Sequence, residues 1–311
     1  MELQWHVGCV TERADQGQLF FQGGSGQKRA GRLYIIVLPM LKLWNAASFR
    51  SVLENGRTKP LVIECIQIPD SIVLDLDSPA PERREFVVKA IGNPEVDESL
   101  IVKELLGNLL ARRYGLTTPE PGLIRISDAF ARAVNPALSR DYGFQIFPGI
   151  AAGCEFIRGG LTPAPASVSF TQAEVPSLAL LYGFDLVTQN PDRLPNRPNF
   201  GLMGRELVAF DFDQCFSFLY IIFNLGQPWE VSKHGIAQKH FCYPRLKNAR
   251  DPVNWADNIN AVMSFSDELL SGLTAWIPET WSGNSATIRD HLAAIREHLG
   301  AFELELQGSV Q

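Results

Sequence analysis

The chain has 311 residues, of which 46% are hydrophobic and 20% charged, and its formal net charge is −6. A chain of this size and composition can bury a full core, either in one two-lobed domain or in two small domains. The negative charge argues against a protein that is held on nucleic acid by a general positive field. The 5 cysteines form no CxxC pair, which predicts reduced thiols in a cytoplasmic protein rather than a disulfide framework.

The first thirty or so residues carry Gly, Gln and Ser clusters without a sustained period, so residues 1–30 are predicted to be a disordered tail. The apolar run 33–41 follows three basic residues and has a faint likeness to a signal peptide. It is too short to span a bilayer and Pro39 interrupts it, so no membrane partner is expected. Met40 is an alternative natural start of the protein.

Residues 31–160 are predicted to form a small β-rich lobe with one long helix. Apolar stretches separated by turn residues predict strands over 60–67, 72–76, 85–90 and 119–126. Before the last of these, apolar residues recur at helical spacing from Leu100 to Leu110, after the N-cap candidate Asp97 and before the helix stop Gly115. Residues 144–160 are extended and punctuated by glycine.

Residues 161–311 are predicted to form a mainly helical lobe. The segment 161–169 is rich in Pro, Ala and Ser and predicts a loop. Apolar periodicity predicts helices over 175–189, 255–273 and 286–304. The stretch 200–211 differs, because two short apolar runs joined by a glycine turn predict a hairpin. The whole pattern predicts an α+β fold with a β-rich N-terminal lobe and a helical C-terminal lobe.

Lys89 and Glu104 form the first candidate pair. Strand alternation places Lys89 on the same face as Val87 within the strand 85–90. Glu104 lies on the helix that follows, from which its carboxylate could reach back to the lysine. A strand lysine held by a helix glutamate is the pair that orients phosphates in kinase-like sites. Each residue taken singly would be interpreted as a solvated surface charge.

The second candidate group is Asp192, Asn199 and Asp211. Phosphoryl transfer needs a carboxylate that orients the attacking hydroxyl, together with oxygen ligands for magnesium. Asp192 fits the first role, and Asn199 with Asp211 fits the second. The hairpin would bring Asn199, which opens its first strand, and Asp211, which ends its second, to the same edge.

Alternatives remain open at this stage. Asn196 is a second candidate for the metal-binding asparagine, although a turn role between Pro195 and Arg197 is its simpler interpretation. Asp213 could join a second magnesium. His234 and His240 lie near a cysteine, but no further ligand stands at zinc-site spacing.

Several segments together resemble a HipA-like kinase domain. These are FVVKA with Lys89, the helix with Glu104, the phrase YGLTTPEP, the loop NPDR…RPNFGL and the strand end LVAFDFD, in that order. The resemblance covers roughly residues 50–220. It implies a bilobal protein-kinase-like fold that binds ATP between the lobes with magnesium as cofactor.

The resemblance also implies roles for single residues. Lys89 would contact the ATP phosphates and Glu104 would anchor it. Asp192 would act as catalytic acid/base, and Asn199 and Asp211 would hold the metal.

Two further segments complete the expected nucleotide site. Gly56 and Arg57 lie in a turn similar to the short Gly-Arg-Thr turn of that family, and they would cover the phosphates. Glu155 and Ile157 lie in the extended run CEFI, where such kinases present backbone groups to adenine.

The function expected from these patterns is ATP- and magnesium-dependent transfer of the γ-phosphate to a hydroxyl of a protein or small molecule that the sequence does not name. The alternative is a nucleotide-binding pseudokinase that acts as a regulatory interaction module. Three departures from the family support the alternative: Asn199 follows Asp192 at a longer interval than in protein kinases, Arg197 replaces an asparagine, and Gly56 is the single glycine of the phosphate-covering loop between Glu54 and Pro60. Nucleotidyl transfer from ATP is a third hypothesis.

Overall fold

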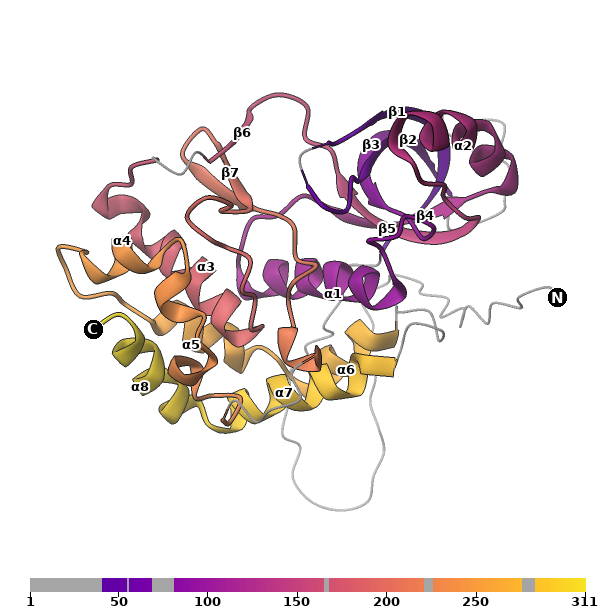
Figure 1. Ribbon diagram of the computed structural model, residues 1–311. Helices are drawn as coiled ribbons and strands as arrows, with labels where there is room; N and C mark the ends of the chain where they lie inside the picture. The colour runs from indigo at the N-terminus through magenta and orange to yellow at the C-terminus, as the bar shows by residue number, and fades with distance from the viewer. Residues whose placement is uncertain (1–40, 55, 69–80, 165–167, 221–225, 276–282) are drawn as a thin grey trace, which may run out of the picture. The chain divides into compact units, whose positions relative to one another are not determined.

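The computed structural model describes residues 41–54, 56–68, 81–164, 168–220, 226–275 and 283–311 (Figure 1). The chain divides into two units, 1–36 and 37–311, and all described residues belong to the second. The predicted tail, the Met40 start and the strand over 72–76 lie outside the described residues. Within the described part of the chain, no helix combines the length and the apolar character that a bilayer crossing requires.

Five strands form a closed barrel in the order β1-β2-β3-β5-β4, which Figure 1 shows as a ring. Their bounds are β1 (Leu43–Val52), β2 (Leu61–Gln67), β3 (Arg83–Lys89), β4 (Pro121–Ile126) and β5 (Gly149–Glu155). Neighbours are antiparallel except β1 and β4, whose parallel pairing closes the ring. Lys89 is the last residue of β3 and lies opposite Ala152 of β5.

The helix α2 (Asp128–Tyr142) belongs to the core of the barrel, although the sequence patterns above did not predict it. The Ser127 side chain caps its start by accepting a hydrogen bond from the Phe130 N–H. Phe130, Val134 and Leu138 recur at helical spacing and are buried with the barrel strands. Pro136 inside the helix obscures this pattern in the sequence.

The long helix α1 (Glu98–Tyr114) confirms the predicted helix. The Asp97 carboxylate accepts from the Leu100 N–H at the start, and Gly115 ends the helix at a φ of 100°. Residues 100–111 of α1 are all buried, Lys103 and Glu104 included, whereas Arg112 and Arg113 in its last turn are exposed. The helix therefore contributes to the core on all sides rather than on one amphipathic face.

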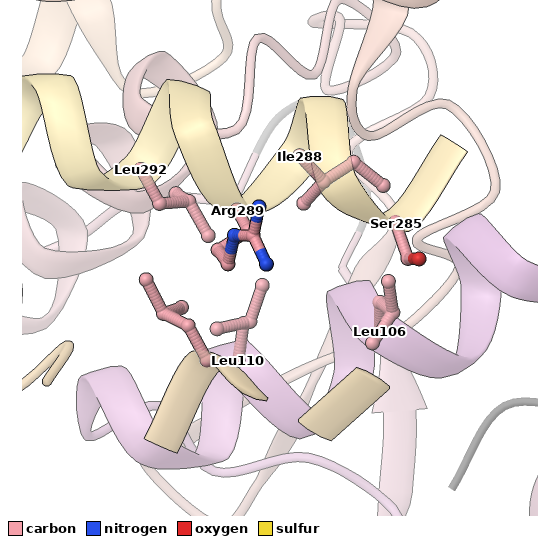
Figure 2. A pocket seen from close by; sticks show the side chains of 7 residues that line it. Leu106, Leu110, Ser285, Ile288, Arg289 and Leu292 are labelled. Carbon is pink, nitrogen blue, oxygen red and sulfur yellow. The ribbon is translucent and has the colours of Figure 1, made fainter. Parts of the chain in front are cut away.

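The burial of α1 follows from its neighbours. It packs against β5 on one side and against the C-terminal helices on the other (Figure 1). Figure 2 shows Leu106 and Leu110 of α1 facing Ile288 and Leu292 of α7 (Ser285–Glu297) across a small apolar pocket. A displacement of α1 would disturb both the barrel and the helical part.

Helices dominate the rest of the described chain. The α-helices besides α7 are α3 (Val175–Val187), α4 (Tyr243–Lys247), α5 (Ala256–Met263), α6 (Asp267–Ala275) and α8 (Leu299–Ser309), and the 3₁₀ helices are η1 (Gln172–Glu174), η2 (Ser217–Tyr220), η3 (Val231–His234) and η4 (Ala237–Lys239). The predictions of one continuous helix over 255–273 and of another over 286–304 were wrong, because the first range contains α5 and α6 and the second α7 and α8. The Ser266 hydroxyl caps the start of α6 by accepting from the Leu269 N–H, and the helical backbone is interrupted again at His298.

A three-stranded sheet lies beside these helices, in the order β6-β7-β8. β7 (Phe200–Met203) and β8 (Glu206–Ala209) form the predicted hairpin, with Gly204 in its turn at a φ of 65°. β6 (Leu161–Pro163) corrects the predicted loop over 161–169, since it pairs with β7. The described residues thus form a mixed α+β fold.

Candidate functional site

Lys89 and Glu104 form the ion pair that the sequence predicted. Lys89 Nζ lies 2.8 Å from Glu104 Oε2, and both residues are 7% exposed. β3 delivers the lysine and the second turn of α1 delivers the glutamate. Because α1 is packed on all sides, the glutamate is held in place by its helix.

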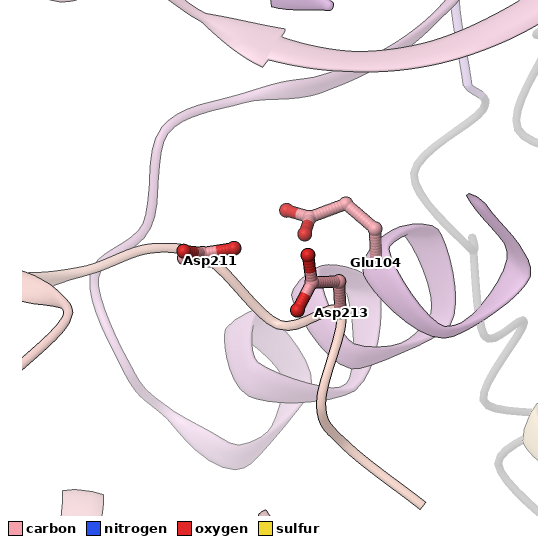
Figure 3. A group of neighbouring side chains, drawn as sticks. All are labelled: Glu104, Asp211 and Asp213. Atoms are coloured by element: carbon pink, nitrogen blue, oxygen red, sulfur yellow. The ribbon is translucent and has the colours of Figure 1, made fainter. Parts of the chain in front are cut away.

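Asp211 and Asp213 complete what we call the Lys89 cluster. Lys89 Nζ lies 2.7 Å from Asp211 Oδ1 and 2.8 Å from Asp213 Oδ2. The three carboxylates face one another in Figure 3, and one oxygen of each lies within 4.8 Å of one oxygen of the other two. The Phe212 N–H, between the two aspartates, donates to Glu104 Oε2 at 3.1 Å.

A glycine of α1 allows this close approach. A Cβ added to Gly107 would lie 2.6 Å from the Cβ of Phe212 and 3.2 Å from the sulfur of Cys215. Any larger residue would push the segment after β8 away from α1. Gly107 therefore lets Asp211 and Asp213 reach the lysine.

The charges of the Lys89 cluster do not balance, since one ammonium faces three carboxylates. Burial lowers the pKa of Lys89, but the three acids outweigh it and hold that pKa well above its usual value. Burial raises the pKa of Glu104, against the opposing effect of Lys89. Burial also acts to raise the pKa of Asp213, yet the ion pair with Lys89 keeps it below its usual value. Such a cluster favours the arrival of further positive charge.

Asp192 lies in the loop before β7 and contacts two other side chains. Arg197 Nη1 lies 3.1 Å from Asp192 Oδ1, and Asn199 Nδ2 donates to Asp192 Oδ2 at 3.0 Å. Burial raises the pKa of the Asp192 carboxyl, while Arg197 and Asn199 oppose that rise and the carboxylate of Asp211 adds to it. The arrangement places a partly buried carboxylate beside an amide and a guanidinium.

A tight turn explains the long interval between Asp192 and Asn199. The backbones of Leu194 and Arg197 exchange two hydrogen bonds, each 3.0 Å long. Pro195 and Asn196 are thereby pushed out to the exposed tip of the turn. The extra residues are taken up by this turn, and Asn199 still returns to Asp192.

The β7–β8 hairpin brings Asn199 and Asp211 to one edge, as predicted. The Phe210 N–H donates to the Asn199 carbonyl at 3.2 Å, so Asp211 directly follows the residue paired with Asn199. Both have positive φ, 49° for Asn199 and 63° for Asp211. Their side chains do not contact each other among the described residues, because Asn199 bonds Asp192 and Asp211 bonds Lys89.

Sequence reasoning missed a buried polar network that we call the Arg193 network, formed by Asp185, Asn190, Arg193 and His240. Arg193 Nε lies 2.5 Å from Asp185 Oδ2, and neither side chain is exposed. Asn190 and His240 bond the same carboxylate. The available signal was an aspartate among the apolar residues of α3. His240 therefore bonds a carboxylate rather than joining His234 at a metal site.

The remaining predicted residues are placed less tightly. Gly56 and Arg57 are exposed in the β1–β2 connection, where Arg57 pairs with Glu95 at 3.1 Å. Nothing in the described residues joins them to the Lys89 cluster. The Glu155 N–H donates to the Glu120 carbonyl at 2.8 Å, so this N–H is not free for adenine. Ile157 is half-buried just after β5.

No protein-family model matches the chain, and no curated protein sequence matches it either. Among solved structures, the chain is similar to the crystal structure of the Helicobacter pylori proinflammatory kinase CtkA. The identity is 11% and the TM-score 0.42, over 83% of this chain and 96% of that one. A similarity this weak does not establish a shared fold.

Proposed function

We propose that the chain is an ATP- and magnesium-dependent kinase of the HipA-like type, with a bilobal protein-kinase-like fold. Residues 31–160 would form the N-terminal lobe and residues 161–311 the C-terminal lobe. The observation that carries the proposal is the Lys89 cluster, in which a lysine is held by a helix glutamate beside the carboxylates that end a hairpin. This is the combination that phosphoryl transfer uses.

The side chains present fit a magnesium ion. Asn199, Asp211 and Asp213 offer the amide and carboxylate oxygens that magnesium prefers. The excess negative charge of the Lys89 cluster favours a divalent cation, which when bound would neutralise charge on the transferred phosphate. Asn199 and Asp211 are the primary ligands in this proposal, with Asp213 as an additional one.

The chain's own residues would then perform three tasks. Lys89 orients the ATP phosphates while Glu104 holds it. Asp192 accepts the proton of the acceptor hydroxyl. As it does so, the hydroxyl oxygen forms a bond to the γ-phosphorus, and the bond from that phosphorus to the ADP oxygen breaks. Positioning and electrostatics supply most of the rate in such a reaction. The acceptor is a protein or small molecule with a hydroxyl group.

The nucleotide would be held by contacts that remain proposals. Gly56 and Arg57 would cover the phosphates, and the backbone around Glu155 and Ile157 would contact adenine through atoms other than the engaged Glu155 N–H. The turn at Leu194 supports an active enzyme over a pseudokinase, because it removes the spacing argument for lost catalysis.

A paired measurement tests the proposal. The first part is a thermal-shift titration with ATP, with and without magnesium; saturation at a hundred times the dissociation constant stabilises a protein by about 2.7 kcal/mol. The second part is ATP turnover by the parent and by Asp192→Asn. We expect a magnesium-dependent shift in both proteins and turnover only in the parent. A shift without turnover in the parent supports the pseudokinase, and no shift at millimolar ATP refutes both.

A further inference from the structure

The Arg193 network lies next to the proposed site without belonging to it. The Arg193 and Asp185 side chains are fully buried, and the guanidinium carbon lies 5.2 Å from the centroid of the Phe212 ring. A buried ion pair is weak evidence for stability, since desolvation offsets much of its attraction. The placement of this pair therefore needs another explanation.

The contacts of Nη1 supply that explanation. It donates to the carbonyl oxygen of Asn199 and, at 3.3 Å, to that of Phe210. Asn199 is a proposed metal ligand, and Phe210 directly precedes the other, Asp211. Arg193 also follows Asp192 in the chain. One guanidinium thus joins the loop that carries Asp192 to the start of β7 and the end of β8.

Backbone conformation gives independent support. Asn199 and Asp211 both occupy the left-handed region, with φ of 49° and 63°. Asparagine and aspartate adopt this conformation more readily than other residues with a Cβ, but it still costs free energy that neighbouring contacts can offset. The hydrogen bonds from Arg193 restrain the carbonyl of Asn199 itself and the carbonyl of Phe210, which directly precedes Asp211.

The other members of the network fix Asp185 in turn. Asn190 Nδ2 donates to Asp185 Oδ1 at 2.9 Å, and His240 Nε2 lies 3.0 Å from Oδ2. The Cys242 N–H donates to His240 Nδ1 at 3.0 Å, so the ring proton is on Nε2, directed at the carboxylate. Asp185 is therefore surrounded by donors that fix its orientation.

We infer that Arg193 is a positioning residue, which sets the spacing between Asp192 and the ligand residues Asn199 and Asp211. The inference rests on the proposed phosphotransfer function. Arg193 acts through backbone carbonyls and touches neither metal nor nucleotide. Asp185 and His240 hold the guanidinium in the orientation that this role requires.

The test separates positioning from stability. Arg193→Met leaves a buried carboxylate unpaired and should lower the melting temperature, whereas the double variant Arg193→Met/Asp185→Asn removes both charges and keeps one carbonyl oxygen as acceptor for either Asn190 or His240. We expect the double variant to melt at a higher temperature than Arg193→Met, because it leaves no unpaired buried charge, although one buried donor loses its acceptor. We also expect it to need about 10–100-fold more magnesium for half-maximal ATP turnover, or to turn over slower by that factor. Asp185→Asn alone should show the same change in smaller degree, which keeps the test open if the double variant does not fold.

Arg296→Met is the matched control. Arg296 also donates to a backbone carbonyl, that of Phe265 at 2.6 Å, and pairs with Asp267 at 2.7 Å, but these contacts join the end of α7 to the start of α6, away from the proposed site. It should lower the melting temperature and leave the magnesium requirement unchanged. If the parent is active and the double variant has the same turnover and the same magnesium requirement, the inference about Arg193 is overturned while the proposed function stands. A parent with neither turnover nor a magnesium-dependent thermal shift with ATP overturns the proposed function, and the inference with it.

Discussion

The Lys89 cluster, which is buried except for Asp211, and the fully buried Arg193–Asp185 pair of the Arg193 network balance their charges differently. In the first, one ammonium faces three carboxylates. In the second, one guanidinium faces one carboxylate, and the neutral side chains of Asn190 and His240 donate to that carboxylate as well. An unbalanced cluster gains stability when a cation binds, whereas a balanced one holds neighbouring backbone in place. The contrast separates residues that would bind a ligand from residues that would position them.

The largest effect is expected for Lys89→Met. The substitution leaves two buried carboxylates and the partly exposed Asp211 without their cation, so it should destabilise the fold by about 3–5 kcal/mol. It should also lower turnover by about 10²–10³-fold, the range found when a charge-stabilising donor is removed. Chemical denaturation and ATP turnover measure the two effects.

Lys103→Met is the matched control for this prediction. Lys103 is also a buried lysine, but its Nζ lies 4.5 Å from the Tyr220 ring centroid and forms no ion pair among the described residues. Its loss should change turnover only several-fold. Equal effects of the two substitutions would contradict the special role of Lys89.

The next effect compares two asparagines of one loop. Asn199→Ala should lower magnesium-dependent turnover by about a hundredfold, because it removes a proposed ligand and the hydrogen bond to Asp192. Asn196→Ala should change turnover little, since Asn196 lies at the exposed tip of the turn. Turnover measured over a magnesium titration distinguishes the two variants. The reverse ranking would mean that the loop uses Asn196 as the ligand.

Asp213→Asn should have a smaller effect on stability than Lys89→Met. The ion pair with Lys89 keeps the pKa of Asp213 below its usual value, so the carboxylate stabilises the folded state, and its loss in magnesium-free buffer should destabilise the protein by about 1 kcal/mol, a shift of about 2–4 °C. Added magnesium should stabilise the variant less than the parent. Asp290→Asn is the control, because Asp290 is an exposed acid of α7 and should show neither change. A higher melting temperature for Asp213→Asn without magnesium would contradict a stabilising ion pair between Asp213 and Lys89.

The same contrast explains what the sequence could predict. Lys89 and Glu104 were predictable because each lies on an element with clear periodicity, and the interval between strand and helix is short. The turn at Leu194 was not, since its two backbone hydrogen bonds leave no signature beyond Pro195. Asp185 and His240 could not be paired from sequence because they lie 55 positions apart on unrelated elements.

Long-range pairing limited the fold prediction as well. The parallel contact of β1 with β4 closes the barrel between segments far apart in the chain, and no local pattern encodes it. The break between α5 and α6 depends on Ser264 and Ser266, whose hydroxyls bond nearby backbone. Apolar periodicity continues through that break, which is why it predicted one helix.

Protons should act on Glu104 of the Lys89 cluster and on His240 of the Arg193 network in opposite directions. The pKa of Glu104 is raised from 4.5 by burial, so its contribution to stability is largest in acid and is lost as the pH rises through the folded value. The pKa of His240 is lowered from 6.5, also by burial, so its contribution is present above pH 6.5 and is lost as the pH falls. Each group changes the free energy of unfolding by at most about 1.36 kcal/mol per pH unit.

The smallest predicted effect is therefore a change of slope in stability against pH. Glu104→Gln removes a contribution to the free energy of unfolding that falls as the pH rises. Between pH 5 and 7 the free energy of unfolding of this variant should therefore rise more steeply than that of the parent. His240→Gln removes a contribution that rises with pH, so the free energy of unfolding of this variant should rise less steeply with pH than that of the parent. His234 and His291 also have lowered pKa values, so part of the pH dependence remains. Urea unfolding at several pH values measures these slopes. Changes of the same sign in both variants would contradict the opposite proton responses of Glu104 and His240.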